Sequence, residues 1–142
     1  MKNTLIDAGP LIALFDKDDK YNNAVIEFLK NYKGKLITTW PVITEVSHLL
    51  NFNVNVQIDF LKWLRREAIN IINIENDYLE RIIELTKKYS NVPMDLADSS
   101  LVVIAEMTGY RDIATIDSDY YIYRIKDKKF FNNVLSDYLK NK

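Results

Sequence analysis

The 142-residue sequence contains no cysteine, a single histidine, and only three glycines and three prolines. Without cysteine there can be no disulfide, no thiolate nucleophile and no zinc site built on cysteine. Scarce glycine and proline argue against a long disordered linker, and no apolar run approaches the roughly 20 residues needed to cross a bilayer. The missing cysteine also suits a reducing compartment. We therefore expect a single cytoplasmic domain over residues 1–142 with no membrane segment.

The formal net charge of −1 argues against a protein that binds nucleic acid by bulk charge. The C-terminal end is more basic, and its cations alternate with aromatic residues, a combination that can bind single-stranded RNA. Its six cations are Arg124, Lys126, Lys128, Lys129, Lys140 and Lys142, of which the first three are our candidate RNA-binding residues. The alternative is a solvated tail whose aromatics pack on the core.

Two kinds of apolar segment alternate along the chain. Short β-branched runs at 3–7, 35–39, 69–74 and 112–116 predict strands. Longer segments at 9–15, 21–32, 40–50, 75–90 and 94–109 predict helices. Residues 51–60 alternate like a strand but continue at helical spacing, so we interpret them as a loop and then a helix from about Asn55. The order favours a parallel sheet covered by helices on both faces.

Four carboxylates stand where predicted strands end or helices begin. Asp7 follows the first strand, Asp117 follows the fourth, Glu45 lies early in the helix after the second, and Asp98 lies in the first turns of a helix that begins near Asp95. In a parallel sheet these positions gather at one edge. Clustered carboxylates repel one another unless a divalent cation binds them, and oxygen ligands suit Mg²⁺ or Mn²⁺.

Each acid also has a purely structural explanation. Asp7 could cap the helix that follows it, and Asp95 could be an N-cap with Asp98 complementing the helix dipole. Asp117 and Asp119 could each begin a turn.

The sequence lacks the residues that other common kinds of active site require. The sequence has no Gly-x-Gly-x-x-Gly and no Gly-Lys-Ser/Thr loop for a nucleotide. Glu45-x-x-His48 matches half of a di-iron site, but a second histidine is missing. A Ser-His-Asp triad could draw only on His48, which we expect to be packed inside an apolar helix. An aspartyl phosphatase typically needs a second Asp two residues after the first, where this chain has Gly9.

Four segments in order, LIDAGPLIALFDKDD, TTWPVITEVSHLL, MDLADSSLVVIAE and ATIDSDYYIYR, resemble the signatures of PIN domains, in particular VapC-like toxin ribonucleases. The resemblance covers roughly residues 5 to 125. It implies a three-layer α/β/α sandwich around a parallel sheet of about four to five strands. It also implies Mg²⁺-dependent endoribonuclease activity, a homodimer and a cognate antitoxin.

Carried over by position, the four family acids are Asp7, Glu45, Asp98 and Asp117. Thr115 matches a hydroxyl residue before the last acid, Asp95 is an additional acid, and Ala8 stands where many relatives carry Ser or Thr. The resemblance implies that Asp7 and Asp98 bind the principal Mg²⁺, while Glu45 and Asp117 complete the site or hold a second ion. A water activated there would attack phosphorus and leave a 3′-hydroxyl and a 5′-phosphate.

Two alternatives stay open. A housekeeping PIN nuclease could mature ribosomal RNA or cut DNA flaps, although 142 residues leave no room for a long helical arch. A PIN-fold binding module could have lost catalysis, but the four retained acids argue against it. Between Phe52 and Trp63 the chain is apolar on more than one face, which predicts a dimer contact.

Overall fold

The computed structural model describes residues 2–140, which form a five-stranded sheet in the order β3-β2-β1-β4-β7. Every neighbouring pair in this sheet is parallel. The strands are β1 (Lys2–Ile6), β2 (Gly34–Thr39), β3 (Asn70–Ile72), β4 (Asp112–Ala114) and β7 (Asn132–Asn133). The predicted parallel sheet is confirmed, with a fifth strand that the sequence pattern did not reveal.

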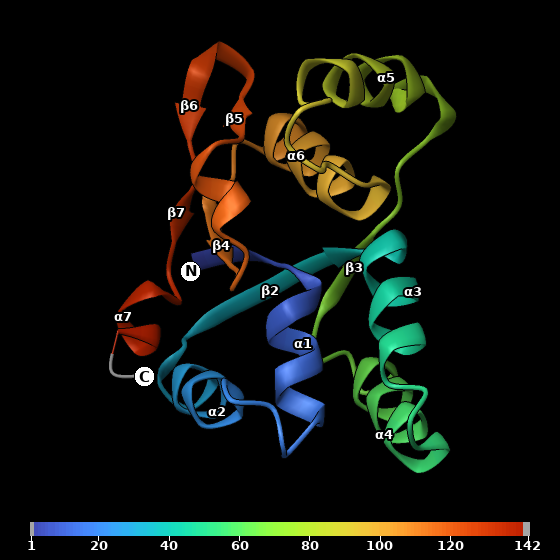
Figure 1. Cartoon of the computed structure of the whole chain (residues 1–142), viewed down its shortest axis with the longest axis vertical. Coiled ribbons are helices and arrows are strands. Elements are labelled where there is room, and N and C mark those ends of the chain that lie inside the picture. Colours follow the sequence, from blue (N-terminus) through green and yellow to red (C-terminus); the bar gives the residue numbers. More distant parts are fainter. Residues whose placement is uncertain (1, 141–142) are drawn as a thin grey trace.

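Helices cover both faces of the sheet, as Figure 1 shows. On one face lie α5 (Leu79–Lys88) and α6 (Leu96–Thr108), and on the other α1 (Ala8–Phe15), α2 (Asn22–Asn31) and α4 (Val54–Arg65). Helix α3 (Trp40–Leu49) contacts both α1 and α6. This is the α/β/α sandwich that the sequence predicts. No helix within residues 2–140 is long and apolar enough to span a membrane.

The central position of α6 in the fold explains why most of its residues are apolar. All nine residues from Ala97 to Ala105 are buried, because the sheet, α5 and α3 surround this helix. On the opposite face, Phe15 of α1 meets Phe60 and Trp63 of α4 edge to face at 5.4 and 5.5 Å between ring centroids. The predicted start of α4 near Asn55 is confirmed, and Asn53 caps it by accepting the Asn55 N–H.

The starts of α3 and α6 position residues near the carboxyl edge of the sheet. Thr39 occupies the N-cap position of α3, but its side chain makes no capping hydrogen bond. Its hydroxyl instead meets Ser100 Oγ at 2.6 Å, which ties β2 to α6. Helix α6 begins with a full capping box between Asp95 and Asp98 and ends at Gly109, whose φ of 80° lies in the left-handed region.

The C-terminal segment contains short elements that the sequence pattern missed. Strands β5 (Arg124–Ile125) and β6 (Lys129–Phe130) form an antiparallel hairpin, and α7 (Ser136–Leu139) follows β7. The short 3₁₀ helices are η1 (Asn76–Tyr78), η2 (Ser118–Tyr121) and η3 (Lys126–Lys128). Two-residue strands are too short to show a side-chain alternation, so no sequence pattern could indicate them.

Candidate metal centre at the carboxyl edge of the sheet

The sheet topology brings three predicted acids together. The chain passes from β1 to β2 and β3 on one side, while β4 pairs with the other side of β1, with Ile6 opposite Ala114. Asp7 follows β1, Asp117 follows β4, and Asp98 comes from the first turn of α6. One carboxylate oxygen from each lies within 4.8 Å of the others. The acids therefore meet where the strand order reverses, which is the usual place for a site in such sheets.

Thr115 connects two of these acids. Its hydroxyl donates a hydrogen bond to Asp7 Oδ2 at 3.0 Å and accepts one from the Asp117 N–H at 3.0 Å. Asp117 Oδ1 in turn accepts the Asp119 N–H at 2.9 Å. Asp117 thus begins a turn, as its structural explanation proposed, and still reaches the acid cluster. Asp7 occupies the N-cap position of α1 without a capping hydrogen bond from its side chain.

Asp98 is held by its own helix and by two tyrosines. In the capping box, Asp95 Oδ1 accepts the Asp98 N–H at 2.9 Å and the Asp95 N–H donates to Asp98 Oδ2 at 3.3 Å. Tyr120 donates to Asp98 Oδ1 at 3.2 Å, and the Tyr123 hydroxyl lies 3.4 Å from Asp98 Oδ2. Both tyrosines are buried. Sequence reasoning missed this role, because it read the aromatic run only as a candidate RNA contact or as core packing.

Burial leaves the cluster with uncompensated negative charge. Desolvation raises the pKa of Asp7 to about 6, with Asp117 and Glu45 adding repulsion. Desolvation likewise raises the pKa of Asp98 to about 7, with contributions from Asp7 and Asp95. Among residues 2–140, no salt-bridge partner offsets these charges. Neutralising these acids therefore requires a cation from outside the protein.

All six predicted acids line one hollow of about 430 Å³. They are Asp7, Glu45, Asp95, Asp98, Asp117 and Asp119. Glu45 lies outside the group of three that approach within 4.8 Å. The pKa of Glu45 is raised by partial burial and by repulsion from Asp95 and Asp117, so Glu45 interacts electrostatically with the other acids of the hollow. Ala8 also lines the hollow and supplies no oxygen ligand there.

The donor set fits a hard divalent cation. Three carboxylates converge with no histidine or sulfur among them, and oxygen-only ligation suits Mg²⁺ or Mn²⁺. A bound divalent ion would also remove the repulsion that raises the two pKa values. Asp7, Asp98 and Asp117 are the residues that could hold it.

The three candidate RNA-binding cations lie in different surroundings. Arg124 Nη1 donates to the carbonyls of Tyr121, Ile122 and Tyr123, and its guanidinium stacks on Phe130 at 4.0 Å. Lys126 lines a separate hollow with residues of α5 and the C-terminal half of α6, and Lys128 is exposed. None of the three lines the acidic hollow. Lys142, which belongs to the same basic run, lies outside the described residues.

His48 differs from its expectation. It is exposed on α3 and not packed inside the helix bundle. The helix contacts the core through Val42, Ile43 and Val46, and position 48 falls on its outer face.

The comparisons with known proteins agree with this architecture. The PIN domain family model matches residues 4–128, so the chain belongs to the PIN domain family. Among solved structures, the chain is similar to the crystal structure of Mycobacterium tuberculosis VapC20, described as a sarcin–ricin loop cleaving toxin. The TM-score is 0.74 at 14% identity, and the match covers 82% of this chain and 91% of that one. At this identity the likeness concerns the fold alone. No curated protein matches the chain.

Proposed function

We propose that this PIN domain is a divalent-metal-dependent endoribonuclease. Its role would be that of a VapC-like toxin that cleaves RNA in the cytoplasm. The observation that carries the proposal is the convergence of Asp7, Asp98 and Asp117, the first two of them buried, in one hollow of a PIN-family chain. The similar VapC20 structure, described as a sarcin–ricin loop cleaving toxin, adds support for RNA as the substrate. A cognate antitoxin and a homodimer belong to the same proposal.

The residues divide the work as follows. Asp7 and Asp98 would bind the principal Mg²⁺ or Mn²⁺, while Asp117 and Glu45 would complete the site or hold a second ion. Thr115 fixes the Asp7 carboxylate, and Asp95 fixes the first turn of α6 and thereby Asp98. When bound, the divalent ion would activate water and neutralise charge on the phosphate. With its single exposed histidine outside the acidic hollow, the chain offers no evident general base other than these acids.

The test digests a labelled single-stranded RNA pool of many sequence contexts with purified protein freed of any antitoxin. We expect cleavage that EDTA abolishes and that Mg²⁺ or Mn²⁺ restores, leaving 3′-hydroxyl and 5′-phosphate ends. Asp7→Asn should lower the rate roughly 10³-fold or more, because the loss of one ligand misplaces both water and phosphate. Asp18→Asn, the same change at an exposed position outside the hollow, is the matched control.

Two outcomes would contradict the mechanism: cleavage that persists without metal, and 2′,3′-cyclic phosphate ends. RNA binding without cleavage in every metal would favour the catalytically inactive binding module. Cleavage confined to precursor ribosomal RNA, with no growth arrest on expression, would favour a housekeeping nuclease. Neutralising Arg124, Lys126 and Lys128 should weaken RNA binding and flatten its salt dependence without changing the dependence on metal.

A further inference from the structure

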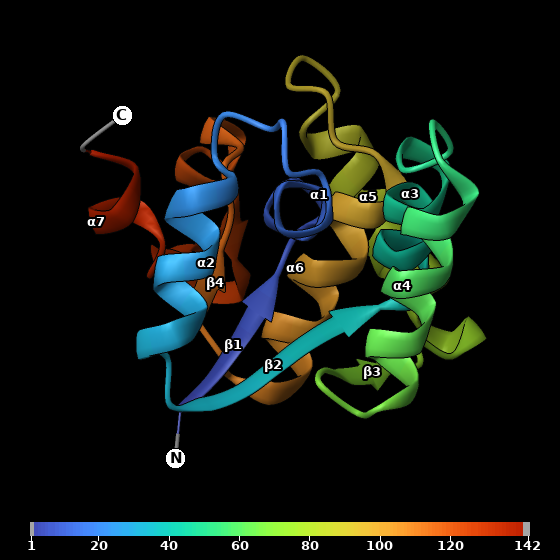
Figure 2. The ribbon, with the colours of Figure 1, turned by 90° about the horizontal axis from the view of Figure 1, so that it is seen from below.

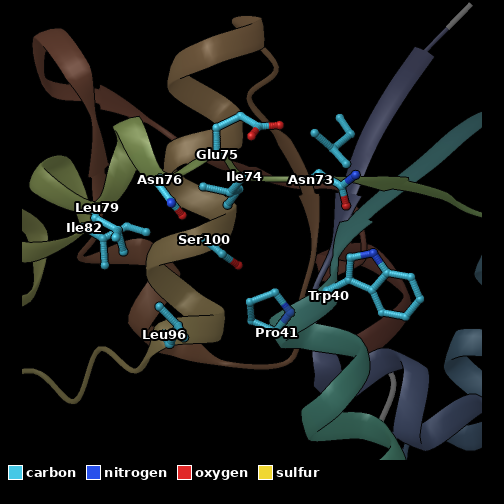
Figure 3. Close-up of a pocket in the computed structure, with 11 residues that line it drawn as sticks. Trp40, Pro41, Asn73, Ile74, Glu75, Asn76, Leu79, Ile82, Leu96 and Ser100 are labelled. Carbon is cyan, nitrogen blue, oxygen red and sulfur yellow. The ribbon is translucent and has the colours of Figure 1, made fainter.

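A second hollow lies beside the acidic one at the same edge of the sheet. It has a volume of about 420 Å³ and lies beyond the carboxyl ends of β2 and β3 (Figure 3). Its walls come from three segments: the start of α3, the loop after β3, and the first turns of α6. The residues that matter below are Trp40, Pro41, Asn73, Asn76, Leu96 and Ser100. We name it the Trp40 pocket.

The Trp40 pocket is continuous with the acidic hollow. A shallow depression of about 560 Å³ shares Trp40, Pro41 and Leu96 with the Trp40 pocket. The same depression shares Glu45 and Asp95 with the acidic hollow. The three hollows therefore form one track along the carboxyl edge of the sheet, with the acid cluster at one end and the Trp40 pocket at the other.

Trp40 has the exposure and the anchoring of a stacking platform. It is 53% exposed, although it directly follows Thr39, which is fully buried at the end of β2. As the first residue of α3 it has a fixed backbone, and its carbonyl accepts the Thr44 hydroxyl at 3.0 Å. In Figure 3 the indole lies beside Pro41, on the side of the pocket opposite Leu79. An exposed indole on a fixed backbone is the kind of surface on which a base of single-stranded RNA stacks.

Two amide side chains offer hydrogen bonds to a flat polar ligand. Asn73 and Asn76 line the pocket after β3, and both are exposed, so their amides are open to a ligand. An amide both donates and accepts, so it can read the edge of a nucleobase. Ser100 is less available, because its hydroxyl already donates to the Ala97 carbonyl at 2.7 Å and meets Thr39.

The charge of the track selects a base over a phosphate at this end. Among the described residues, no lysine or arginine lines any of the three hollows, and His48 in the connecting depression is the one basic side chain. Glu75 lines the Trp40 pocket, Glu45 and Asp95 line the depression, and the acid cluster lies at the far end. A phosphate in the Trp40 pocket would meet the carboxylate of Glu75 without a lysine or arginine to offset the repulsion. An uncharged, flat ligand with hydrogen-bonding edges suits an indole, a proline ring and two amides.

We propose that the Trp40 pocket binds an unpaired base of the RNA strand whose neighbouring phosphodiester is held at the acid cluster. This inference rests on the proposed ribonuclease function and adds a base-reading subsite to it. Trp40 supplies stacking, and Asn73 and Asn76 supply base preference. A second copy of this chain is the competing occupant of an exposed tryptophan, and the experiments below distinguish the two.

The first experiment measures kcat/KM on a single-stranded RNA pool with randomised bases around the cleaved position. Trp40→Ala should reduce kcat/KM roughly 5- to 150-fold, the loss expected for one stacked base. Trp40→Tyr should retain most of it, and Asn76→Ala should change the preferred base at one flanking position. Ile83→Ala is the control, because Ile83 is 46% exposed on α5, lies outside the surface predicted to form a dimer and lines none of the three hollows.

The second experiment does not depend on cleavage. The chain has two tryptophans, so Trp63→Phe leaves Trp40 as the only indole. With Asp7→Asn added to prevent cleavage, short RNA homopolymers of each base are titrated while Trp40 emission and the anisotropy of the labelled RNA are followed. We expect quenching that depends on the base and saturates together with the anisotropy.

Each result has a defined meaning. If the wild type cleaves RNA and Trp40→Ala cleaves with the same kcat/KM and flanking preference, the pocket proposal is overturned and the ribonuclease stands. If no RNA is cleaved but Trp40 is quenched by one base more than by others, the binding site stands and the ribonuclease does not. RNA binding that leaves Trp40 emission unchanged overturns the pocket. So does a Trp40→Ala protein that changes from dimer to monomer by light scattering, because a second copy would then cover the indole.

Discussion

At the scale of single residues, the hydroxyl of Tyr120 holds Asp98 in place. It is fully surrounded by protein and donates to Asp98 Oδ1 at 3.2 Å. Tyr120→Phe should leave the fold intact but weaken Mn²⁺ binding by roughly 10- to 100-fold, the usual effect of losing a partner behind a metal ligand. Isothermal titration with Mn²⁺ measures this directly. Tyr138→Phe is the control, since its ring packs on Phe28 and it does not line the acidic hollow. Equal affinities in all three proteins would contradict a positioning role for Tyr120.

At the same scale, the titration of two buried acids makes the stability of the metal-free protein depend on pH. The pKa of Asp7 is raised to about 6 and that of Asp98 to about 7 by burial. Both groups then bind protons more tightly in the native state than in the unfolded chain. Their contribution to metal-free stability is therefore present below the ordinary pKa of 3.8 and is lost as the pH rises through about 6 to 7.

A divalent cation needs the ionised carboxylates, so its stabilising effect should grow over the same interval. We expect millimolar Mn²⁺ to raise Tm more at pH of about 7.5 than at about 5.5, measured by thermal unfolding. Asp98→Asn should reduce the gain at the higher pH. An unchanged Tm of the unmutated protein in Mn²⁺ at the higher pH would count heavily against the site.

At the scale of secondary-structure elements, the site residues that the sequence could predict are those at the ends of strands and the starts of helices. Asp7 and Asp117 end apolar strand patterns, and Asp95 with Asp98 opens an apolar helix, so their positions could be read from the sequence. The parallel sheet then requires their ends to meet. The tyrosines behind Asp98 could not be predicted, because their placement depends on η2 and β5, which are two to four residues long and carry no periodicity.

The Trp40 pocket was equally hidden from the sequence. Trp40 and Leu96 read as ordinary apolar residues at helix starts, and Asn73 and Asn76 as loop residues. Only the neighbouring positions of β2 and β3 in the sheet bring these segments to one hollow. The expected buried environment of His48 was wrong for a related reason: an apolar segment predicts a helix, but not which of its positions face the core.

At the scale of the whole molecule, α4 presents apolar residues on two faces. One face packs on α1 through Phe60 and Trp63. The other carries Val54, Ile58 and Leu61, which are exposed by 62, 42 and 48% and follow one another at helical spacing. We name these three residues the α4 stripe. Figure 2 shows α4 at the edge of the molecule, beside α3. Phe52, 58% exposed just before the helix, extends the same surface.

The α4 stripe supports the proposed homodimer, because a second copy would remove this apolar surface from water. We expect light scattering of the eluting protein at micromolar concentration to give the mass of a dimer. The double substitution Ile58→Glu and Leu61→Glu should give a folded monomer. Each chain would contribute two carboxylates, so a symmetric interface would bury four of them without cationic partners. The double substitution Ile83→Glu and Met107→Glu adds the same charge outside the stripe, at positions 46% and 42% exposed on α5 and α6, and should remain a dimer. A monomeric wild type, or a dimer that survives the double substitution, would show that the stripe is not the interface. Because the acid cluster lies within one chain, a folded monomer should still bind Mn²⁺ with the wild-type affinity.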